Sequence, residues 1–164
     1  MLYHVRAIFK YRVQDKGLRL PFSIDENMPS ILNGDSYRLN QILVNLIGNS
    51  IKFTHEGFID MNISIQKRTS NESLLNFVIS DTGIGIEKDK IDRIFESFTQ
   101  ASAETSRKYG GTGLGLAITK QLLEMLGGNI SVESKINSGT IFRFSIPYKH
   151  PEADRLESVA PKET

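Results

Sequence analysis

The 164-residue sequence has no cysteine, no tryptophan and no marked excess of one charge. Without cysteine, the chain has neither disulfides nor thiolate metal sites, and it lacks a cysteine nucleophile. The 20 basic and 19 acidic side chains leave a net charge of +1, which predicts no nucleic-acid partner and no direct membrane contact. No apolar run could span a bilayer, and the first residues are no signal peptide. We therefore expect one soluble domain, or the soluble piece of a longer protein.

The spacing of apolar residues predicts alternating helices and strands. Helical spacing covers residues 2–17, 36–54, 87–98 and 114–126. Alternating patterns predict strands at 18–24, 58–66, 74–80, 129–134 and 140–148. Pro21 favours a sheet edge for the first strand, and short polar turns join the later strands into antiparallel hairpins.

The apolar positions of the first and last helices are expected to face the core. In the first helix these are Leu2, Val5, Ile8, Phe9 and Val13. In the last they are Leu114, Ile118, Leu122, Met125 and Leu126. Glycines at 17 and 127–128 fit helix C-terminal caps, which is why the helices are expected to end there.

The helix over residues 36–54 carries both an apolar face and a narrow polar stripe. Asn45, Asn49 and Lys52 lie on that stripe, since they are four and three residues apart. Amide oxygen is a suitable ligand for Mg²⁺, and a lysine ammonium suits phosphate. A solvated surface face is the alternative interpretation, but such faces usually mix Glu with Lys, and this stripe has no carboxylate. The buried face is predicted to comprise Leu39, Ile42, Leu43, Leu46 and Ile47.

Two glycine-rich segments provide places for a ligand to approach the backbone. The sequence from Asp81 to Ile86 follows a strand and contains two glycines one residue apart, which predicts a tight loop. The sequence from Gly110 to Leu116 precedes a helix, so its N–H groups form a candidate phosphate cradle. Its spacing fits neither a P-loop nor a dinucleotide-binding turn. Residues 99–109 are polar and aperiodic, and predict a mobile lid.

Together these segments resemble the catalytic ATP-binding domain of sensor histidine kinases. The segment from Asp35 to Thr54 resembles the family's N box, and that from Asp81 to Ile86 resembles its first glycine box. Phe95-x-x-Phe98 resembles the F box. The segment from Gly110 to Leu116 resembles the second glycine box, and Ser138-Gly139-Thr140 the final glycine-threonine element. All occur in the family's order, which leaves little room for coincidence.

The resemblance implies an α/β (α+β) fold shared with gyrase, the large heat-shock chaperones and mismatch-repair ATPases. This is a two-layer sandwich with a mixed, mostly antiparallel sheet, helices on one face and a mobile ATP lid. Residues 1–148 would form the catalytic domain and 149–164 a polar tail. The implied cofactors are ATP and Mg²⁺. The implied nucleotide-binding residues are Asn45, Asn49, Lys52, Phe53, Asp81, Gly83, Gly85, Ile86, Gly111, Thr112, Gly113, Leu114, Gly115 and Thr140.

By the same resemblance, individual residues receive individual roles. The Asp81 carboxylate would accept from the adenine amino group, Asn49 would bind Mg²⁺, and Lys52 would contact phosphate. Asn45 would lie beside the phosphates and metal, so Asn45 and Lys52 are the catalytic candidates.

Other residues retain two interpretations. Phe53 would stack on adenine or pack in the core. Thr140 would bond near adenine or simply suit a strand. Backbone N–H groups of residues 113–115 would donate to phosphate. Arg107 or Lys108 would contact the γ-phosphate when the lid closes, or would be ordinary basic residues of a surface loop.

The phosphoacceptor histidine expected of the family is missing. His55 is followed by the acidic Glu56 but then by glycine and no proline, His4 lacks an acidic neighbour, and His150 lies in the polar tail. All three are therefore expected to be surface or packing residues. We therefore expect phosphoryl transfer to a helical hairpin elsewhere in the same or a dimeric protein, and from there to a response regulator. The alternatives are a non-catalytic ATP-binding interaction module and a gyrase-like hydrolase. Asn45 stands where gyrase-like relatives have a glutamate base, which disfavours the hydrolase.

Overall fold

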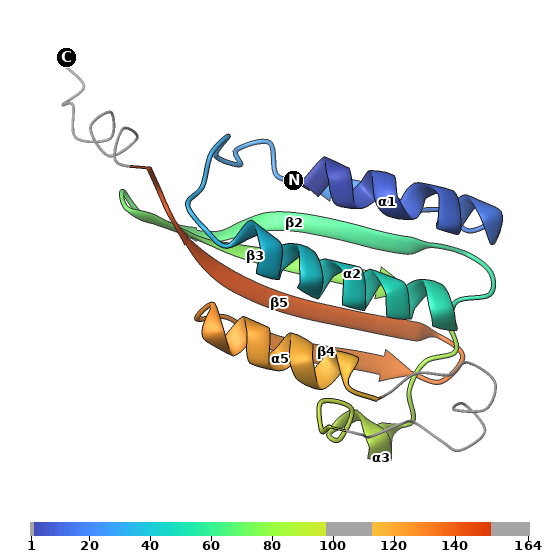
Figure 1. Cartoon of the computed structure of the whole chain (residues 1–164). Helices are drawn as coiled ribbons and strands as arrows, with labels where there is room; N and C mark the ends of the chain where they lie inside the picture. The colour runs from blue at the N-terminus through green and yellow to red at the C-terminus, as the bar shows by residue number, and fades with distance from the viewer. Residues whose placement is uncertain (1, 98–112, 152–164) are drawn as a thin grey trace.

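A computed structural model describes residues 2–97 and 113–151 of the chain. It is a two-layer structure in which helices cover one face of a five-stranded sheet (Figure 1). The helices are α1 (Leu2–Asp15), α2 (Ser36–Phe53), α3 (Lys88–Ile91) and α5 (Gly115–Met125). The strands are β1 (Phe22–Ile24), β2 (Ile59–Arg68), β3 (Glu72–Asp81), β4 (Asn129–Lys135) and β5 (Gly139–Lys149). The expected fold class is confirmed.

The sheet has the strand order β1-β2-β3-β5-β4. Strand β1 pairs parallel with β2, and every other pairing is antiparallel, so the sheet is mixed as expected. Strand β1 lies at an edge, and it begins after Pro21, which has no N–H to donate. The central strands β3 and β5 pair along their whole lengths, from Glu72 with Lys149 to Asp81 with Thr140. This register brings two predicted site residues side by side.

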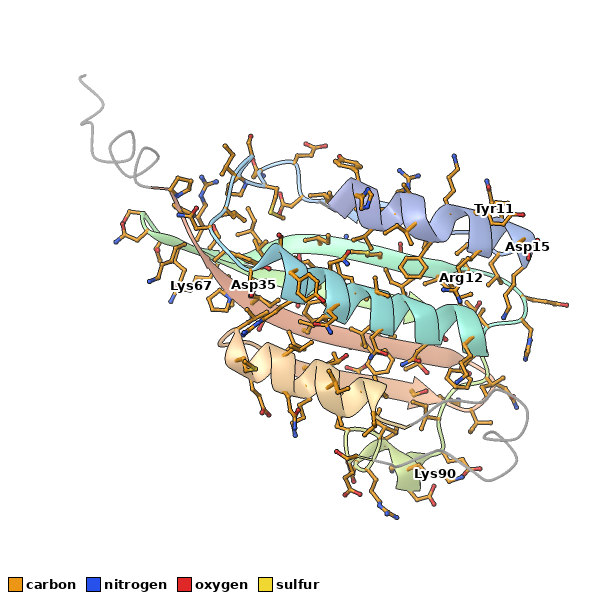
Figure 2. All side chains as sticks on the ribbon, viewed as in Figure 1. Tyr11, Arg12, Asp15, Asp35, Lys67 and Lys90 are labelled. Atoms are coloured by element: carbon orange, nitrogen blue, oxygen red, sulfur yellow. The ribbon has the colours of Figure 1, made fainter. Side chains whose placement is uncertain are left out.

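Helix α2 is built as its sequence predicts. Its N-terminal cap is Asp35, whose side chain accepts from the Arg38 N–H at 3.0 Å (Figure 2 shows where Asp35 lies). Its apolar stripe packs on the sheet, and the expected positions are all 5% exposed or less. The residues buried along this stripe are Leu39, Ile42, Leu43, Leu46, Ile47 and Ile51. The polar stripe consequently faces away from the core.

The predicted apolar faces of α1 and α5 are partly wrong. In α1, Val5, Phe9 and Val13 are buried, but Ile8 is 44% exposed. Neighbouring Tyr11 also projects from the helix layer (Figure 2). In α5, Ile118 and Met125 are exposed, whereas the buried residues are Ala117, Thr119 and Leu123. Apolar residues surround α5, so its spacing alone does not fix which side meets the core.

Helix α3 is shorter than the predicted helix over 87–98. Only Lys88–Ile91 is helical, and turns follow as far as residue 97. The Arg93 N–H donates to the Lys90 carbonyl, and the Glu96 N–H to the Arg93 carbonyl, each at 3.0 Å. These bonds span three residues rather than the four of an α-helix, so the segment coils more tightly than predicted.

Strand β5 continues through Lys149, and His150 packs immediately after it. His150 is 5% exposed, and its Nε2 lies 2.8 Å from the Ser73 hydroxyl. Its Nδ1 lies 3.2 Å from the Ser70 carbonyl, so the ring joins the end of β5 to the β2–β3 turn. Lys149 and His150 thus belong to the folded domain. Within residues 2–97 and 113–151, no helix is both long and apolar enough to cross a membrane.

Candidate functional site

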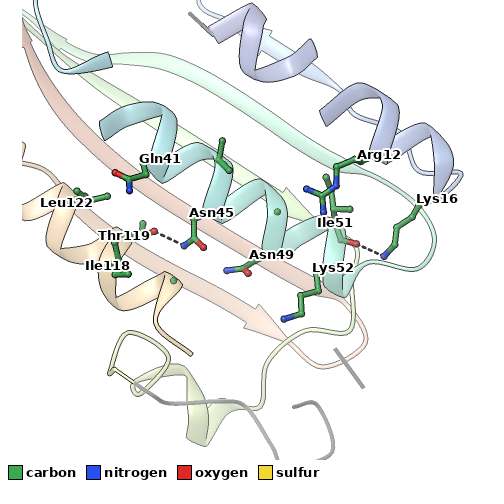
Figure 3. A pocket seen from close by; sticks show the side chains of 13 residues that line it. Arg12, Lys16, Gln41, Asn45, Asn49, Ile51, Lys52, Ile118, Thr119 and Leu122 are labelled. Atoms are coloured by element: carbon green, nitrogen blue, oxygen red, sulfur yellow. Dashed lines mark hydrogen bonds between the residues drawn. The ribbon is translucent and has the colours of Figure 1, made fainter. Parts of the chain in front are cut away.

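The polar stripe of α2 forms the floor of a groove of about 710 Å³ between α1, α2 and α5 (Figure 3). Asn45, Asn49 and Lys52 line it, as the helical spacing predicts. Gly115 and Thr119 line it from α5, Arg12 lines it from α1, and Lys16 lines it from the turn that follows α1. The described lining includes three cations and no carboxylate. Its charge therefore suits an anionic ligand.

All three cations also contact nearby groups, and the Arg12 guanidinium lies 5.8 Å from the centre of the Phe9 ring. Lys16 Nζ lies 2.6 Å from the Ile51 carbonyl and 3.4 Å from the Thr54 carbonyl, so it caps the C-terminal end of α2. The Lys52 ammonium lies 5.0 Å from the centre of the Phe53 ring. Phe53 is half-buried beside this end of the helix. The last turn of α2 is thus held by the turn that follows α1, and it presents Lys52 on its groove side.

Asn45 is fixed by a contact with α5. Its Nδ2 donates to Thr119 Oγ1 at 2.7 Å, across 74 positions of sequence. A Cβ placed on Gly115 would overlap the Asn45 Oδ1, so a side chain larger than glycine would displace this amide. Glycine at 115 is therefore required by close approach. Gly113, two residues earlier, has a φ of 70°, a conformation that favours glycine as well.

Asp81 is a buried carboxylate that receives hydrogen bonds from several elements. Ser50, on α2, donates from its hydroxyl to Oδ2 at 2.9 Å. The Gly83 N–H donates to Oδ1 at 2.9 Å, and the Thr140 N–H donates to the same oxygen at 3.3 Å. Since Ser50 directly follows Asn49, this carboxylate adjoins the amide-bearing stripe through one residue of α2.

The protonation of Asp81 reflects two opposing effects. Its side chain is buried, with 8% of the residue exposed. Burial raises the pKa of the Asp81 carboxyl above its ordinary value, while the bonds from Gly83, Ser50 and Thr140 favour the ionised form and limit the increase. The three donors hold the carboxylate in one orientation.

The first glycine loop is packed too closely for side chains at its glycines. A Cβ on Gly83 would lie 2.5 Å from the Phe53 carbonyl oxygen and 2.9 Å from Asp81 Oδ1. Gly85 has a φ of 73° and abuts the Lys135 backbone. The loop is also bonded to the second hairpin, because the Ile86 N–H donates to Ser134 Oγ at 2.8 Å. Gly85 and Ile86 thus shape the loop around Asp81.

One hydroxyl beside Asp81 has no hydrogen-bond partner among the described residues. Thr54 is fully buried, and its Oγ1 is unpaired. It lies near Asp81 Oδ1, because both oxygens would be 2.9 Å from a Cβ on Gly83. A buried unpaired hydroxyl next to a fixed carboxylate suits a ligand that offers both a donor and an acceptor. The amino group and ring nitrogen of adenine have that pattern, so the residues present fit the expected purine.

The predicted site residues that the structure describes lie at two adjoining places, and the others fall outside the described residues. Asn45, Asn49, Lys52 and Gly115 meet at the groove, while the predicted residues around Asp81 meet at the adjoining strand end. Phe95 is half-buried against the core. Gly111, Thr112, Phe98, Arg107, Lys108 and the predicted lid lie outside the described residues.

Sequence reasoning missed several residues that shape the site. Ser50, Thr54, Thr119 and Lys16 were assigned no role. The one available signal was a threonine within the apolar stretch of α5, where a hydroxyl requires a partner. The remaining contacts join segments at least 31 positions apart and become evident only in the folded chain.

Curated proteins with similar sequences are histidine kinases. The chain is 44% identical over 147 residues to hybrid signal transduction histidine kinase B of Dictyostelium discoideum, a match that covers 90% of the chain and 8% of that protein. It is 43% identical over 154 residues to the autoinducer 2 sensor kinase/phosphatase LuxQ of Vibrio vulnificus (strain CMCP6), covering 92% of the chain and 18% of that protein. The chain thus spans less than a fifth of the length of these relatives.

Solved structures with the same fold agree. Full-length ShkA in complex with AMPPNP aligns with a TM-score of 0.76 and 31% identity, over 93% of this chain and 30% of that chain. A nucleotide-free form of the catalytic domain of histidine kinase ThkA aligns with a TM-score of 0.68 and 26% identity, over 88% of each chain. Residues 34–150 match the family described as histidine kinase-, DNA gyrase B- and HSP90-like ATPase. The chain therefore belongs to that family, as an ATP-binding catalytic domain of the histidine kinase type.

Proposed function

We propose that this domain transfers the γ-phosphoryl group of MgATP to a histidine on a partner helical hairpin. That hairpin belongs to the same or a dimeric full-length protein, and the phosphoryl group passes on to a response regulator. The proposal is supported by the similarity to histidine kinases and by the adjoining carboxylate and amide-lined groove. Together they offer a base-recognition end and a phosphate end to one nucleotide.

Each end is assigned by its chemistry. The Asp81 carboxylate accepts from the adenine amino group, and Thr54 and Thr140 lie beside it. Asn49 serves as the Mg²⁺ ligand and Lys52 as the phosphate contact. The N–H groups at the start of α5, over residues 113–115, donate to phosphate oxygens. Phe53 stacks on the base, while Gly83, Gly85 and Ile86 shape the loop that encloses it.

Bound Mg²⁺ would neutralise charge on the phosphate oxygens, which is the chemistry that it supplies to phosphoryl transfer. The residues of the chain itself then position the nucleotide and offset its negative charge, and none of them forms a covalent bond with it. Asn49 and Lys52 orient the phosphate end, and the cationic lining reduces its repulsion of an approaching nucleophile. Such catalysis requires little covalent chemistry from the domain itself.

The observation that carries this assignment is the side chain at position 45. The Asn45 amide faces the groove and has no group that could accept a proton at neutral pH. Activation of water for hydrolysis requires such a base close to the phosphates. An amide there favours transfer to a nucleophile supplied by a partner.

The proposal is tested by mixing the chain with the separately produced phosphoacceptor hairpin of a matched kinase and ATP labelled at the γ-phosphate. We expect acid-labile label on the hairpin, dependent on Mg²⁺. A hairpin with glutamine in place of its phosphoacceptor histidine is the control and should remain unlabelled. ATP binding without transfer would instead support an interaction module, and release of inorganic phosphate without labelled hairpin would support a hydrolase.

A further inference from the structure

Thr119 is a buried polar residue of α5 whose hydroxyl bonds to a side chain that lines the groove. It is 1% exposed and lies one turn from the buried Leu123 on the core-facing side of the helix. Its Oγ1 accepts the 2.7 Å hydrogen bond from Asn45 Nδ2, drawn as a dashed line in Figure 3. A valine would fill the same volume without a hydroxyl. The hydroxyl is thus explained by its contact with Asn45 rather than by packing.

The contact determines how the Asn45 amide is turned. A threonine hydroxyl within a helix can donate to a carbonyl one turn earlier, which leaves its lone pairs for an incoming N–H. The amino end of the Asn45 amide is then used by Thr119. The oxygen end is directed at Gly115, where the absence of a Cβ leaves room for it. The carbonyl oxygen is therefore presented at the start of α5, beside the candidate phosphate cradle.

We propose that Thr119 is a positioning residue that holds the Asn45 amide with its oxygen toward the metal–phosphate end of the nucleotide. This inference rests on the proposed function, because it assumes that MgATP occupies the groove. An amide oxygen is a ligand for Mg²⁺ or for the water bound to it, whereas the amino group at the same place would repel the cation. Thr119 thereby acts through Asn45 on binding of the metal-bound nucleotide.

A merely structural role for Thr119 would be a tether that joins α2 to α5. The two roles differ in what they predict for nucleotide binding. A tether supports the fold and would affect ATP equally with and without Mg²⁺. A positioning residue affects mainly the Mg²⁺-dependent part of the affinity. It also has no effect once the Asn45 side chain has been removed.

The test compares Thr119→Val with Thr119→Ser in the complete chain. Calorimetry measures the dissociation constant of ATP with saturating Mg²⁺ and again with EDTA, and thermal unfolding follows stability. Ser145→Ala is the matched control, since it removes a hydroxyl–amide hydrogen bond of 3.0 Å between Ser145 and Asn129 that lies outside the groove. Asn45→Ala and the double variant Asn45→Ala/Thr119→Val complete a cycle.

We expect Thr119→Val to weaken MgATP about fivefold to tenfold, the loss of one hydrogen bond, and to change ATP binding in EDTA less than about twofold. Thr119→Ser and Ser145→Ala should match the parent. In the Asn45→Ala background, Thr119→Val should have no further effect. Equal weakening with and without Mg²⁺, or no weakening at all, would overturn the inference.

The outcome separates this inference from the proposed function. If the parent binds MgATP and Thr119→Val binds it equally well, the positioning role fails while the function stands. If the Mg²⁺-selective loss occurs but the hairpin is never labelled, the phosphotransfer proposal fails and the positioning role stands. A parent chain that binds no adenine nucleotide would contradict both.

Discussion

Ser50 on α2 and Asp81 at the end of β3 are joined by a 2.9 Å hydrogen bond from the hydroxyl to Oδ2. Ser50 is next to Asn49, so one helical residue faces the strand end while its neighbour faces the groove. The side chains of Asn49 and Ser50 therefore project from the same turn of α2, whose apolar face is buried. The distance between the carboxylate and the amide is therefore set by the rigid packing of α2 on the sheet, which is what a site for one extended nucleotide requires.

Replacement of Asp81 by asparagine should remove adenine nucleotide binding without unfolding the domain. The asparagine oxygen can still accept from Gly83 and Thr140, and its amino group can donate to Ser50. An amino group is nevertheless no acceptor for the adenine amine, so calorimetry should show affinity reduced by at least about a hundredfold. Asp60→Asn is the control, because Asp60 alternates with the buried Ile59 and points to the opposite face. Unchanged affinity in Asp81→Asn would contradict the assignment of Asp81.

The raised pKa of Asp81 predicts a specific dependence of stability on pH. The folded state binds more protons than the unfolded state between the ordinary pKa of 3.8 and the raised folded value. The stabilising contribution of this carboxyl is complete below 3.8 and is lost as pH rises through the folded value. The Asp81→Asn variant has no titrating carboxyl at this position, so it lacks this pH-dependent contribution to stability.

Thermal unfolding of the parent and Asp81→Asn, followed by circular dichroism from about pH 3.5 to 7, checks this prediction. The melting temperature of the parent minus that of the variant should fall with rising pH and then level off. Asp60→Asn again serves as the control. A difference that rises with pH would show that the pKa of Asp81 is lowered in the folded chain, contrary to its burial.

Two glycine-to-alanine substitutions should change stability in opposite directions. Gly48 lies within α2, and a Cβ there would meet nothing within 4 Å. Gly48→Ala should therefore stabilise the chain by about 1 kcal/mol through helix propensity. A Cβ on Gly83 would overlap the Phe53 carbonyl oxygen, a backbone atom that cannot rotate away, so Gly83→Ala should destabilise by about 1–3 kcal/mol. Urea unfolding measures both, and destabilisation by Gly48→Ala would be inconsistent with the open space around it.

Loss of the His150 side chain should weaken the fold without affecting nucleotide binding. His150→Ala would leave the buried Ser73 hydroxyl without its 2.8 Å partner, at a cost of about 1–3 kcal/mol in the free energy of unfolding. Thr140 lies near the start of β5 and His150 directly follows its end, roughly 33 Å apart at the usual rise per residue. The dissociation constant for ATP should remain within about twofold of the parent value. A larger change would reveal coupling along the whole strand.

The strands, their hairpins and the faces of α2 were predicted well, whereas side-chain contacts between distant elements were not. The spacing of α2 fixed both its buried face and its polar stripe, because one strong apolar stripe leaves a single way to pack it. The spacing of α5 did not, because Ile118 and Met125 face solvent while Thr119 is buried. The buried hydroxyl of Thr119 is paired with Asn45 of α2, a contact that no local pattern in α5 contains.

The candidate site divides in the same way. The glycine motifs located the loop after β3 and the start of α5, since glycine marks close backbone approach wherever it occurs. Two of the three donors that hold Asp81, Ser50 and Thr140, could not be predicted, because they lie 31 and 59 positions away in the sequence. The predicted helix over residues 87–98 was too long for a local reason. After Ile91 the backbone hydrogen bonds span three residues instead of four, and apolar spacing does not distinguish such turns from an α-helix.

The pairing of Asp81 with Thr140 also bears on how such a domain can change. These residues are neighbours in the central ladder although 59 positions separate them. A ladder holds its register through its own backbone bonds, so the intervening chain can lengthen, shorten or acquire new contacts while the two strand ends stay aligned. Changes in the length of the connecting segment outside its two glycine-rich loops therefore leave the contact between Asp81 and Thr140 in place.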